Sequence, residues 1–305
     1  GYSSVIVLVT GASGFLGTRL VERLIQDNQQ VIAVSRQTIP KEYKGIPRLE
    51  WIKCDLEVDT LDLTAYPFID VVVHLAGATL GAGTDEELFF RANELITMRL
   101  CQMLEEYEAK FIYASSQVVY GNANHLNVIE DFPVGVESSA YACSKLNSEN
   151  WLRWFHHKNE RQYLSLRFCG FIEGGGLVDY VIDQAIENKP IDLFSKGEIC
   201  RDYLPVNDGV ELLMLAINYQ PRSEFVIINV GSGQHVSALE LARYICNEID
   251  STSQINLLSK LAPQSNFVFG IDKAKEVLQF KPSNLIDSVK AYARKRYALT
   301  ITTKI

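Results

Sequence analysis

A tyrosine and a lysine, Tyr141 and Lys145, lie four positions apart in a stretch whose pattern predicts a helix. Residues at this spacing share one helix face, so the ammonium group could lower the pKa of the phenol and suit it to acid–base chemistry near neutral pH. Ser116 lies upstream, just after the short run Phe111–Tyr113, which predicts a strand. Hydroxyl groups at the carboxyl end of a parallel strand lie where open α/β sheets bind ligands. The spacing alone also fits an ordinary tyrosine–lysine pair on a helix surface, so a catalytic pair and a surface pair both stay open here.

A glycine-rich segment follows the first predicted strand and reads Thr10-Gly11-Ala12-Ser13-Gly14-Phe15-Leu16-Gly17. Glycines at this spacing permit a tight turn and let the backbone approach a pyrophosphate, and the next helix begins with free N–H groups for the anion. The spacing G-x-x-G-x-x-G fits the common dinucleotide fingerprint only loosely, and a plain structural turn is the alternative. Its place between a strand and an amphipathic helix favours dinucleotide binding.

The end of the second predicted strand bears on the choice of cofactor. An acidic side chain there would hold the ribose 2′-hydroxyl of NAD, but Val31–Val34 is followed by Ser35 and Arg36. A hydroxyl and a guanidinium suit a 2′-phosphate, which accepts charge-assisted hydrogen bonds. The alternative is a solvated arginine at a strand end. We therefore expect NADP(H) as the favoured cofactor, with NAD possible.

Short apolar runs alternate with longer helical patterns, which predicts βαβ units and a parallel sheet. Most runs are apolar throughout, as in strands covered on both faces. The predicted strands are Val5–Val9, Val31–Val34, Leu49–Ile52, Val71–Val73, Phe111–Tyr113, Tyr163–Leu166 and Phe225–Val230, and the longer predicted helices are Glu86–Glu108 and Ala140–His157. After about residue 166 the elements shorten. We expect a Rossmann-type doubly wound parallel sheet from 1–165 plus about 208–237, interleaved with a smaller C-terminal substrate-binding α/β domain of about 166–207 and 238–305.

The composition excludes several classes of protein. The 305 residues include 29 Lys+Arg and 37 Asp+Glu, a formal net charge of −8, which does not suit the neutralisation of nucleic-acid phosphates. No apolar run approaches the ~18 residues of a membrane span, and the first residues lack the basic region and cleavage site of a signal peptide. The cysteines have no C-x-x-C spacing and the histidines no metal-ligand spacing, and His74 is expected to be a packing or backbone-contact residue. We expect a cytoplasmic protein with no metal site, no membrane and no nucleic-acid partner.

Together these motifs resemble those of the extended short-chain dehydrogenase/reductase family, in its NAD(P)-dependent nucleotide-sugar epimerase/dehydratase branch. The resemblance spans nearly the whole chain. Besides the motifs above, it rests on Cys54-Asp55-Leu56, His74-Leu75-Ala76-Gly77, Asn93 and the segments 197–208 and 229–233.

The resemblance implies roles for individual residues. Tyr141 would be the general acid/base at a sugar hydroxyl or ketone, Ser116 would bind the same oxygen, and Lys145 would bind the nicotinamide ribose and lower the pKa of Tyr141. Gln117 would contact the substrate, and Arg201 resembles the family's diphosphate-binding arginine. The cofactor-binding residues expected from the turn, the second strand and the resemblance are Gly11, Ser13, Gly14, Phe15, Leu16, Gly17, Ser35, Arg36, Asp55, Leu56, Leu75, Ala76, Gly77 and Lys145.

Departures from the family pattern narrow the expected reaction. The sugar 4,6-dehydratases carry an Asp-Glu pair just after the position of Ser116, where this chain has Gln117 and Val118, which cannot transfer protons. We expect hydride transfer at a sugar carbon, C4, and Arg36 favours net reduction of a keto sugar by NADPH. The alternatives are a 4-epimerase with bound NAD and, in a different class, a non-catalytic NAD(P)-sensing relative. The implied partner is a nucleotide-diphosphate sugar, and the chain could form a homodimer.

Overall fold

The computed structural model describes residues 5–83 and 85–304, which divide into two compact units built from interleaved segments. The first unit contains the chain up to residue 121, residues 133–168 and residues 210–228. The second contains residues 122–132, 169–209 and the chain from 229 onward. Residues 1–4, on which the expectation about a signal peptide rests, lie outside the described part. Each unit therefore joins parts that are distant in sequence.

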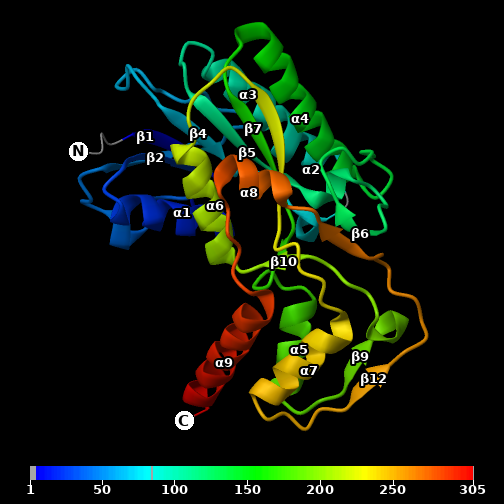
Figure 1. Ribbon diagram of the computed structural model, residues 1–305. Helices are drawn as coiled ribbons and strands as arrows, with labels where there is room; N and C mark the ends of the chain where they lie inside the picture. The colour runs from blue at the N-terminus through cyan, green and yellow to red at the C-terminus, as the bar shows by residue number, and fades with distance from the viewer. Residues whose placement is uncertain (1–4, 84, 305) are drawn as a thin grey trace. The chain divides into compact units, whose positions relative to one another are not determined.

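A seven-stranded sheet forms the centre of the first unit (Figure 1). Its order is β11 (Phe225–Val230), β7 (Tyr163–Phe168), β5 (Lys110–Ser116), β4 (Val71–His74), β1 (Ile6–Thr10), β2 (Gln30–Ser35) and β3 (Leu49–Lys53). The pairings from β7 to β3 are all parallel. Each predicted run overlaps one of these strands, so the predicted doubly wound α/β sheet is confirmed. The order reverses between β1 and β4, which makes their carboxyl ends the topological switch point where such sheets bind ligands.

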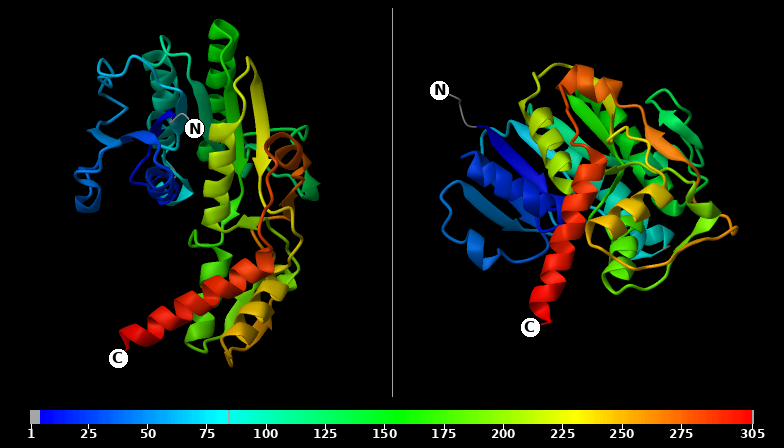
Figure 2. Two further views of the ribbon diagram at one scale, coloured as in Figure 1. Left: turned by 60° about the vertical axis from the view of Figure 1, so that its left-hand side comes forward. Right: turned by 60° about the horizontal axis from the view of Figure 1, so that its bottom comes forward.

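Helices flank this sheet on both sides (Figure 2). On one side, α1 (Phe15–Gln26) buries Leu20, Val21 and Leu24 and is joined to α6 (Val206–Asn218) by an ion pair between Arg23 and Glu211. On the other, α3 (Ile96–Met103) and α4 (Ala140–Asn159) pack into one apolar core with alternate strand residues. The apolar strands are thus covered on both faces, as their composition predicts.

The prediction of one helix over Glu86–Glu108 is wrong in two respects: the helical segment ends earlier, and it is not α-helical throughout. It consists of α2 (Glu86–Phe89), a six-residue π-helix η3 (Phe90–Leu95) and α3, which ends at Met103. The Thr97 hydroxyl donates to the Asn93 carbonyl at 2.7 Å, one turn back. Such side-chain bonds compete with the backbone ladder of an α-helix, and π turns are frequent at functional sites. The π turn holds Asn93 almost fully buried.

The second unit is organised around three helices, α5 (Leu177–Ile186), α7 (Ala238–Glu248) and α9 (Leu285–Thr303), which share one apolar core. A capping box between Ser237 and Glu240 fixes the start of α7. Three short parallel strand pairs complete it: β6 (His125–Val128) with β13 (Phe267–Phe269), β8 (Gly170–Phe171) with β10 (Tyr203–Leu204), and β9 (Ile191–Leu193) with β12 (Ile255–Leu257). Helix α8 (Asp272–Leu278) follows β13.

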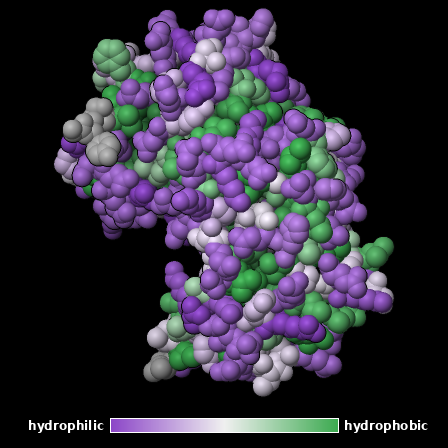
Figure 3. Space-filling model, in the orientation of Figure 1, coloured by the Kyte–Doolittle hydropathy of each residue, from purple (hydrophilic) through white to green (hydrophobic). Residues whose placement is uncertain are grey.

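The surface shown in Figure 3 is largely hydrophilic, with hydrophobic residues in small groups. In the described part of the chain, none of the helices combines the length and the apolar character needed to cross a membrane.

A buried ion pair fastens α4 to the sheet. Arg167 on β7 donates to both carboxylate oxygens of Glu149 on α4, at 2.9 and 2.7 Å, and Ser165 donates to the same carboxylate at 2.9 Å. The two charged side chains are only 3% and 2% exposed. Burying two charges costs free energy that their pairing offsets, so the loss of one partner leaves an uncompensated charge.

Arg167→Met keeps a long apolar stem but leaves the Glu149 carboxylate buried and unpaired. We expect it to lower the free energy of unfolding in urea by about 3–5 kcal/mol. Lys158→Gln is the matched control, since Lys158 pairs with Glu105 at the surface and such pairs contribute about 1 kcal/mol or less. Equal stabilities for the two variants would contradict this account of the pair.

Candidate active site

The predicted glycine turn lies at the carboxyl end of β1, at the switch point of the sheet. Gly11 has φ +66°, and a Cβ atom there would lie 2.7 Å from the backbone nitrogen of Ala76, so only glycine fits. Gly14 is the N-cap of α1 and offers no side-chain cap to the first N–H groups of the helix. Those N–H groups can bind a phosphate, because a helix N-terminus carries free donors and partial positive charge. A Cβ on Gly17 would collide with the Gly11 carbonyl, which explains the third glycine.

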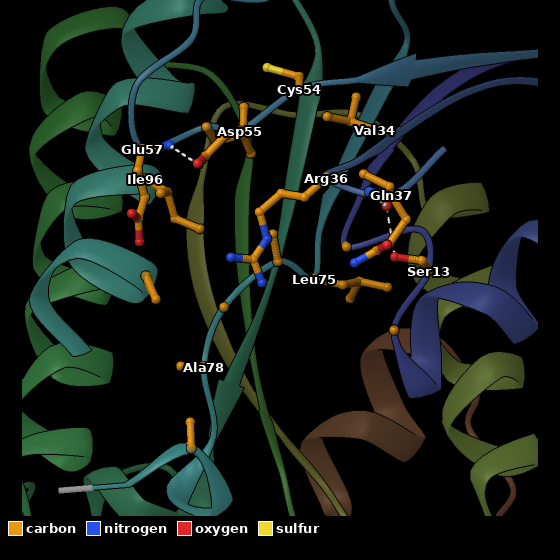
Figure 4. A pocket seen from close by; sticks show the side chains of 18 of the residues that line it. Ser13, Val34, Arg36, Gln37, Cys54, Asp55, Glu57, Leu75, Ala78 and Ile96 are labelled. Atoms are coloured by element: carbon orange, nitrogen blue, oxygen red, sulfur yellow. Dashed lines mark hydrogen bonds between the residues drawn. The ribbon is translucent and has the colours of Figure 1, made fainter. Parts of the chain in front are cut away.

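A cavity of about 430 Å³ opens beside this turn, at the ends of four adjacent strands (Figure 4). Ten of the predicted cofactor-binding residues line it: Gly11, Ser13, Gly14, Ser35, Arg36, Asp55, Leu56, Leu75, Ala76 and Gly77. Phe15, Leu16 and Gly17 lie in the first turn of α1, and Lys145 lies on α4. Sequence reasoning missed several lining residues, among them Gln37, Ala78, Ala92 and Ile96. Gln37 directly follows the predicted pair at the end of β2, whereas the others carry no chemical signal in the sequence.

The cavity's edge at β2 presents a hydroxyl pair and a guanidinium. Ser13 and Ser35 share a hydrogen bond of 2.7 Å, and the Ser35 hydroxyl also accepts from the Gln37 N–H at 2.9 Å. The Arg36 side chain extends from the strand end into the cavity (Figure 4). At β3, Asp55 accepts from the Glu57 N–H at 3.0 Å, which fixes its carboxylate at the cavity wall.

Ser116, Tyr141 and Lys145 all lie in the first unit. Ser116 ends β5, and the Ser139 hydroxyl caps α4 by accepting from the Ala142 N–H at 3.0 Å, which places Tyr141 in the first turn of the helix. Tyr141 is 8% exposed and its ring packs on Phe89. Burial raises the pKa of Tyr141, while a hydrogen bond from Ser116 lowers it by a smaller amount. The expected proximity of Ser116 and Tyr141 is therefore present, but the pKa direction is opposite to the one expected from the lysine spacing.

Lys145 is buried, and its ammonium group faces the sheet. Its Nζ donates to the Ala114 carbonyl at 2.7 Å and lies 4.7 Å from the centre of the Tyr113 ring. Burial lowers the pKa of Lys145 to about 8, and the Glu149 carboxylate one turn further along the helix opposes this shift. The ammonium group is thus engaged with the main chain of β5, which accounts for the weak influence of the lysine on the phenol.

Gln117 and Val118 begin the 3-10 turn η4 (Gln117–Val119), where the Ser116 hydroxyl accepts from the Val118 N–H at 3.2 Å. Among the described residues, Gln117 Oε1 is buried with no hydrogen-bond partner. A buried acceptor without a donor costs free energy, and a ligand hydroxyl could satisfy it.

Arg201 lies in the second unit, where it lines a separate cavity of about 440 Å³ together with Tyr180, Phe194 and Pro263. Its Nη1 donates to the Ser265 carbonyl at 3.0 Å, and its guanidinium lies 5.2 Å from the centre of the Phe267 ring. Burial lowers the pKa of Arg201. Over residues 5–83 and 85–304, no group of three or more His, Cys, Asp or Glu side chains could hold a metal ion.

The parallel sheet, the glycine turn and the cavity at its switch point define a Rossmann-type α/β protein of the dinucleotide-binding class. The model of the NAD dependent epimerase/dehydratase family matches residues 7–231, so the chain belongs to this family of enzymes.

Individual relatives have several activities. The UDP-glucose 4-epimerase of Erwinia amylovora is 28% identical over 277 residues, 78% of this chain and 81% of that protein. The dTDP-4-dehydro-6-deoxyglucose reductase of Escherichia coli is 25% identical over 300 residues, 92% of this chain and 94% of that protein. The crystal structure of the UDP-glucuronic acid 4-epimerase of Bacillus cereus, in complex with NAD, is similar with a TM-score of 0.80 at 25% identity, covering 96% of this chain and 100% of that one.

Lys145→Met should remove a pH-dependent part of the stability. Because the pKa of Lys145 falls from 10.5 to about 8 on folding, the unfolded chain holds more protons between these values. Stability of the wild type relative to the variant should therefore rise as the pH increases from about 8 to about 10.5, by up to about 1.4 kcal/mol per pH unit. Urea unfolding across this range measures the difference. A flat or falling difference for Lys145→Met would refute the burial of its charge.

Proposed function

We propose that this protein is a nucleotide-sugar 4-epimerase that uses NAD. The observation that carries the proposal is the presence of Ser116, Tyr141 and Lys145 in the same structural unit as the dinucleotide cavity. Asn93 links the two regions, because its side chain binds Ala78, which lines the cavity, and also Ser144 on the helix of Tyr141 and Lys145. Epimerases that act on UDP-sugars are prominent among the similar proteins, which supports this reaction over a net reduction.

Bound NAD would supply the acceptor and the donor of hydride at the sugar C4. In this proposal Tyr141 takes the proton of the 4-hydroxyl as hydride leaves the carbon and returns it when hydride comes back to the opposite face. Ser116, which already binds the phenol, holds the same sugar oxygen. Gln117 meets a substrate hydroxyl with its unpartnered Oε1 atom.

The raised pKa of Tyr141 makes its phenol a proton donor as it stands. To act as a base, the phenol needs a positive charge closer to its oxygen. We propose that Lys145, one helical turn away, supplies this charge while it binds the nicotinamide ribose. An ammonium has three donors, so Lys145 can keep its bond to Ala114 and still donate to a ligand.

For the substrate's diphosphate we propose Arg201, because a guanidinium presents paired donors that match phosphate oxygens. The cavity that it lines has apolar walls from Phe194 and Pro263, which suit the nucleoside part of such a ligand. A homodimer also stays a prediction.

A second candidate is a 4-ketoreductase that uses NADPH. The observation in its favour is Arg36, which enters the cavity where an NAD-binding chain commonly has a carboxylate. The similarity to the reductase of Escherichia coli over nearly the whole chain fits this candidate as well.

Incubation of the protein and NAD with UDP-glucose or UDP-glucuronic acid should yield the 4-epimer, seen by proton NMR of the anomeric region. Tyr141→Phe should lower kcat by ~10²–10⁴, since the phenol exchanges the proton as hydride moves. Its NAD dissociation constant should stay within about twofold of the wild type, as the phenol adds little to cofactor binding. The reductase would be the better assignment if no UDP- or dTDP-sugar gives an epimer and a 4-keto sugar is reduced with NADPH. Near-full turnover by Tyr141→Phe would refute the role of Tyr141.

Arg36→Ala should separate the two cofactors. Loss of a charged phosphate partner should raise the NADPH dissociation constant at least tenfold, about 1.4 kcal/mol, and leave that of NADH nearly unchanged. Calorimetric titration of both forms measures the effect, with Arg48→Ala as the control because Arg48 donates to the Asn28 carbonyl instead. An equal loss for both cofactors would place Arg36 away from the 2′-phosphate. Preference of the wild type for NAD would support the epimerase.

A further inference from the structure

A chain of buried polar side chains runs from the strand end beside the glycine turn to the helix that carries Tyr141 and Lys145. Its members come from five different elements, β1, β4, α3, η3 and α4, and each is between 0% and 3% exposed: Thr10, His74, Thr97, Asn93 and Ser144. Buried polar groups weaken a fold unless each finds a partner, so a continuous set of this kind needs an explanation.

The hydrogen bonds along this chain are short and consecutive. Thr10 Oγ1 lies 2.7 Å from His74 Nδ1, and His74 Nε2 lies 2.9 Å from Thr97 Oγ1. The Thr97 hydroxyl donates to the Asn93 carbonyl at 2.7 Å. His74 therefore packs between aromatic rings, as the sequence suggests, and in addition is held by hydroxyls at both ring nitrogens.

The partners determine where the proton of His74 lies. A carbonyl only accepts, so the single hydroxyl hydrogen of Thr97 goes to Asn93, and Thr97 must accept from His74 Nε2–H. At the other nitrogen, Thr10 Oγ1 accepts from two backbone N–H groups and therefore directs its own hydrogen to Nδ1. These partners favour the neutral Nε2–H tautomer, in which every hydrogen in the chain has one direction.

Both ends of this chain reach functional parts of the molecule. At the first end, Thr10 accepts from the N–H groups of Leu75 and Ala76, at 3.0 and 3.1 Å, and both residues line the dinucleotide cavity. At the other end, Asn93 Oδ1 accepts from the Ala78 N–H at 2.8 Å, and its Nδ2 donates to the Ala78 carbonyl at 3.1 Å. A Cβ on Gly77 would lie 2.5 Å from Asn93 Oδ1, so the loop has no room for a side chain there.

A further arm leads from Asn93 to the helix of the predicted catalytic residues. Asn93 Nδ2 lies 3.0 Å from Ser144 Oγ, and the Ser144 hydroxyl donates to the Tyr141 carbonyl at 2.8 Å. Ser144 lies between Tyr141 and Lys145 in sequence, so this arm fixes the first turn of α4.

We propose that His74 is a positioning residue. As the neutral Nε2–H tautomer it fixes the cavity-lining loop 75–78 through Thr10 and Thr97. The same network, through Asn93 and Ser144, ties this loop to the first turn of α4. The proposal rests on the proposed function in that the cavity binds a nicotinamide dinucleotide, and the kcat measurement on Ser144→Ala also needs the proposed turnover. The neutral form is favoured because burial, together with the Lys145 ammonium, lowers the pKa of His74 to about 3. The rings of Phe111 and Tyr113 flank the imidazole at 6.0 and 5.6 Å.

Thr97→Val tests the loop arm, since it keeps the shape of the side chain but takes the acceptor from His74 Nε2–H. Among the described residues, Thr97 lies outside the set that lines the cavity, so no direct contact with the cofactor is lost. We expect the NAD dissociation constant, measured by calorimetry, to rise about tenfold in Thr97→Val. Thr97→Ser restores the hydroxyl and should bind NAD within about twofold of the wild type.

Ser144→Ala tests the other arm, because it separates Asn93 from α4 and leaves the bonds of Asn93 to Ala78 in place. Its kcat should fall at least fivefold while its NAD dissociation constant stays within about twofold of the wild type. A network with a merely structural role would instead lower the melting temperature of both variants and leave NAD affinity and kcat unchanged.

Nitrogen NMR of ¹⁵N-histidine-labelled full-length protein gives a readout that does not depend on activity. At pH 7 the His74 signals should show the Nε2–H tautomer, with Nδ1 unprotonated. An Nδ1–H tautomer or an imidazolium would overturn the proposal, and so would unchanged NAD affinity in a folded Thr97→Val. If that variant does not fold, the tautomer and Ser144→Ala decide. If the wild type binds no NAD, the proposed function fails, whereas the tautomer still tests the network.

Discussion

The close approach of two backbone segments at the switch between β1 and β4 is the constraint on which the site depends. Gly11, after β1, packs against the Leu75–Ala76 peptide after β4, at a distance that no Cβ atom allows. The chain turns away in opposite directions from these two strand ends, so a crevice must open between them. Because both of its edges are main chain, the crevice presents backbone N–H groups and the uncapped start of α1 to a ligand, which is the arrangement that a pyrophosphate needs.

Much of this could be predicted from the sequence because the signals are local. A strand buried on both faces must be apolar throughout, and a turn without room for side chains must be glycine, so β1, Gly11 and Gly17 are all visible in the sequence. The shared helix face of Tyr141 and Lys145 follows in the same way from spacing. These features depend on residues close to one another in the chain.

The features that sequence reasoning missed depend on contacts between distant segments. The π turn at Asn93 breaks a segment that has the pattern of one long helix, and a hydroxyl one turn further on binds the Asn93 carbonyl. The raised pKa of Tyr141 arises from burial, which the spacing to Lys145 does not reveal. His74 reads as a strand-end residue, and only the tertiary fold brings hydroxyls from β1 and α3 to its two nitrogens. Propensity and spacing predict local structure and neighbouring pairs, whereas burial in the tertiary fold determines the pKa values and the hydrogen-bond partners.

Two buried lysines in the same unit differ in how many hydrogen bonds their ammonium groups donate. Burial lowers the pKa of both Lys110 and Lys145 to about 8. The Lys110 ammonium donates to three carbonyls at the end of α6, those of Ala216, Ile217 and Tyr219, which uses all of its donors and caps the helix. In the described structure, Lys145 donates to one carbonyl, that of Ala114, and keeps donors for a ligand. Among the described residues, Gln117 Oε1 likewise has unused capacity, because this buried acceptor has no donor. Because buried polar groups are normally paired, the unused hydrogen-bonding capacity of Lys145 and Gln117 supports the proposal that a cofactor and a substrate bind beside them.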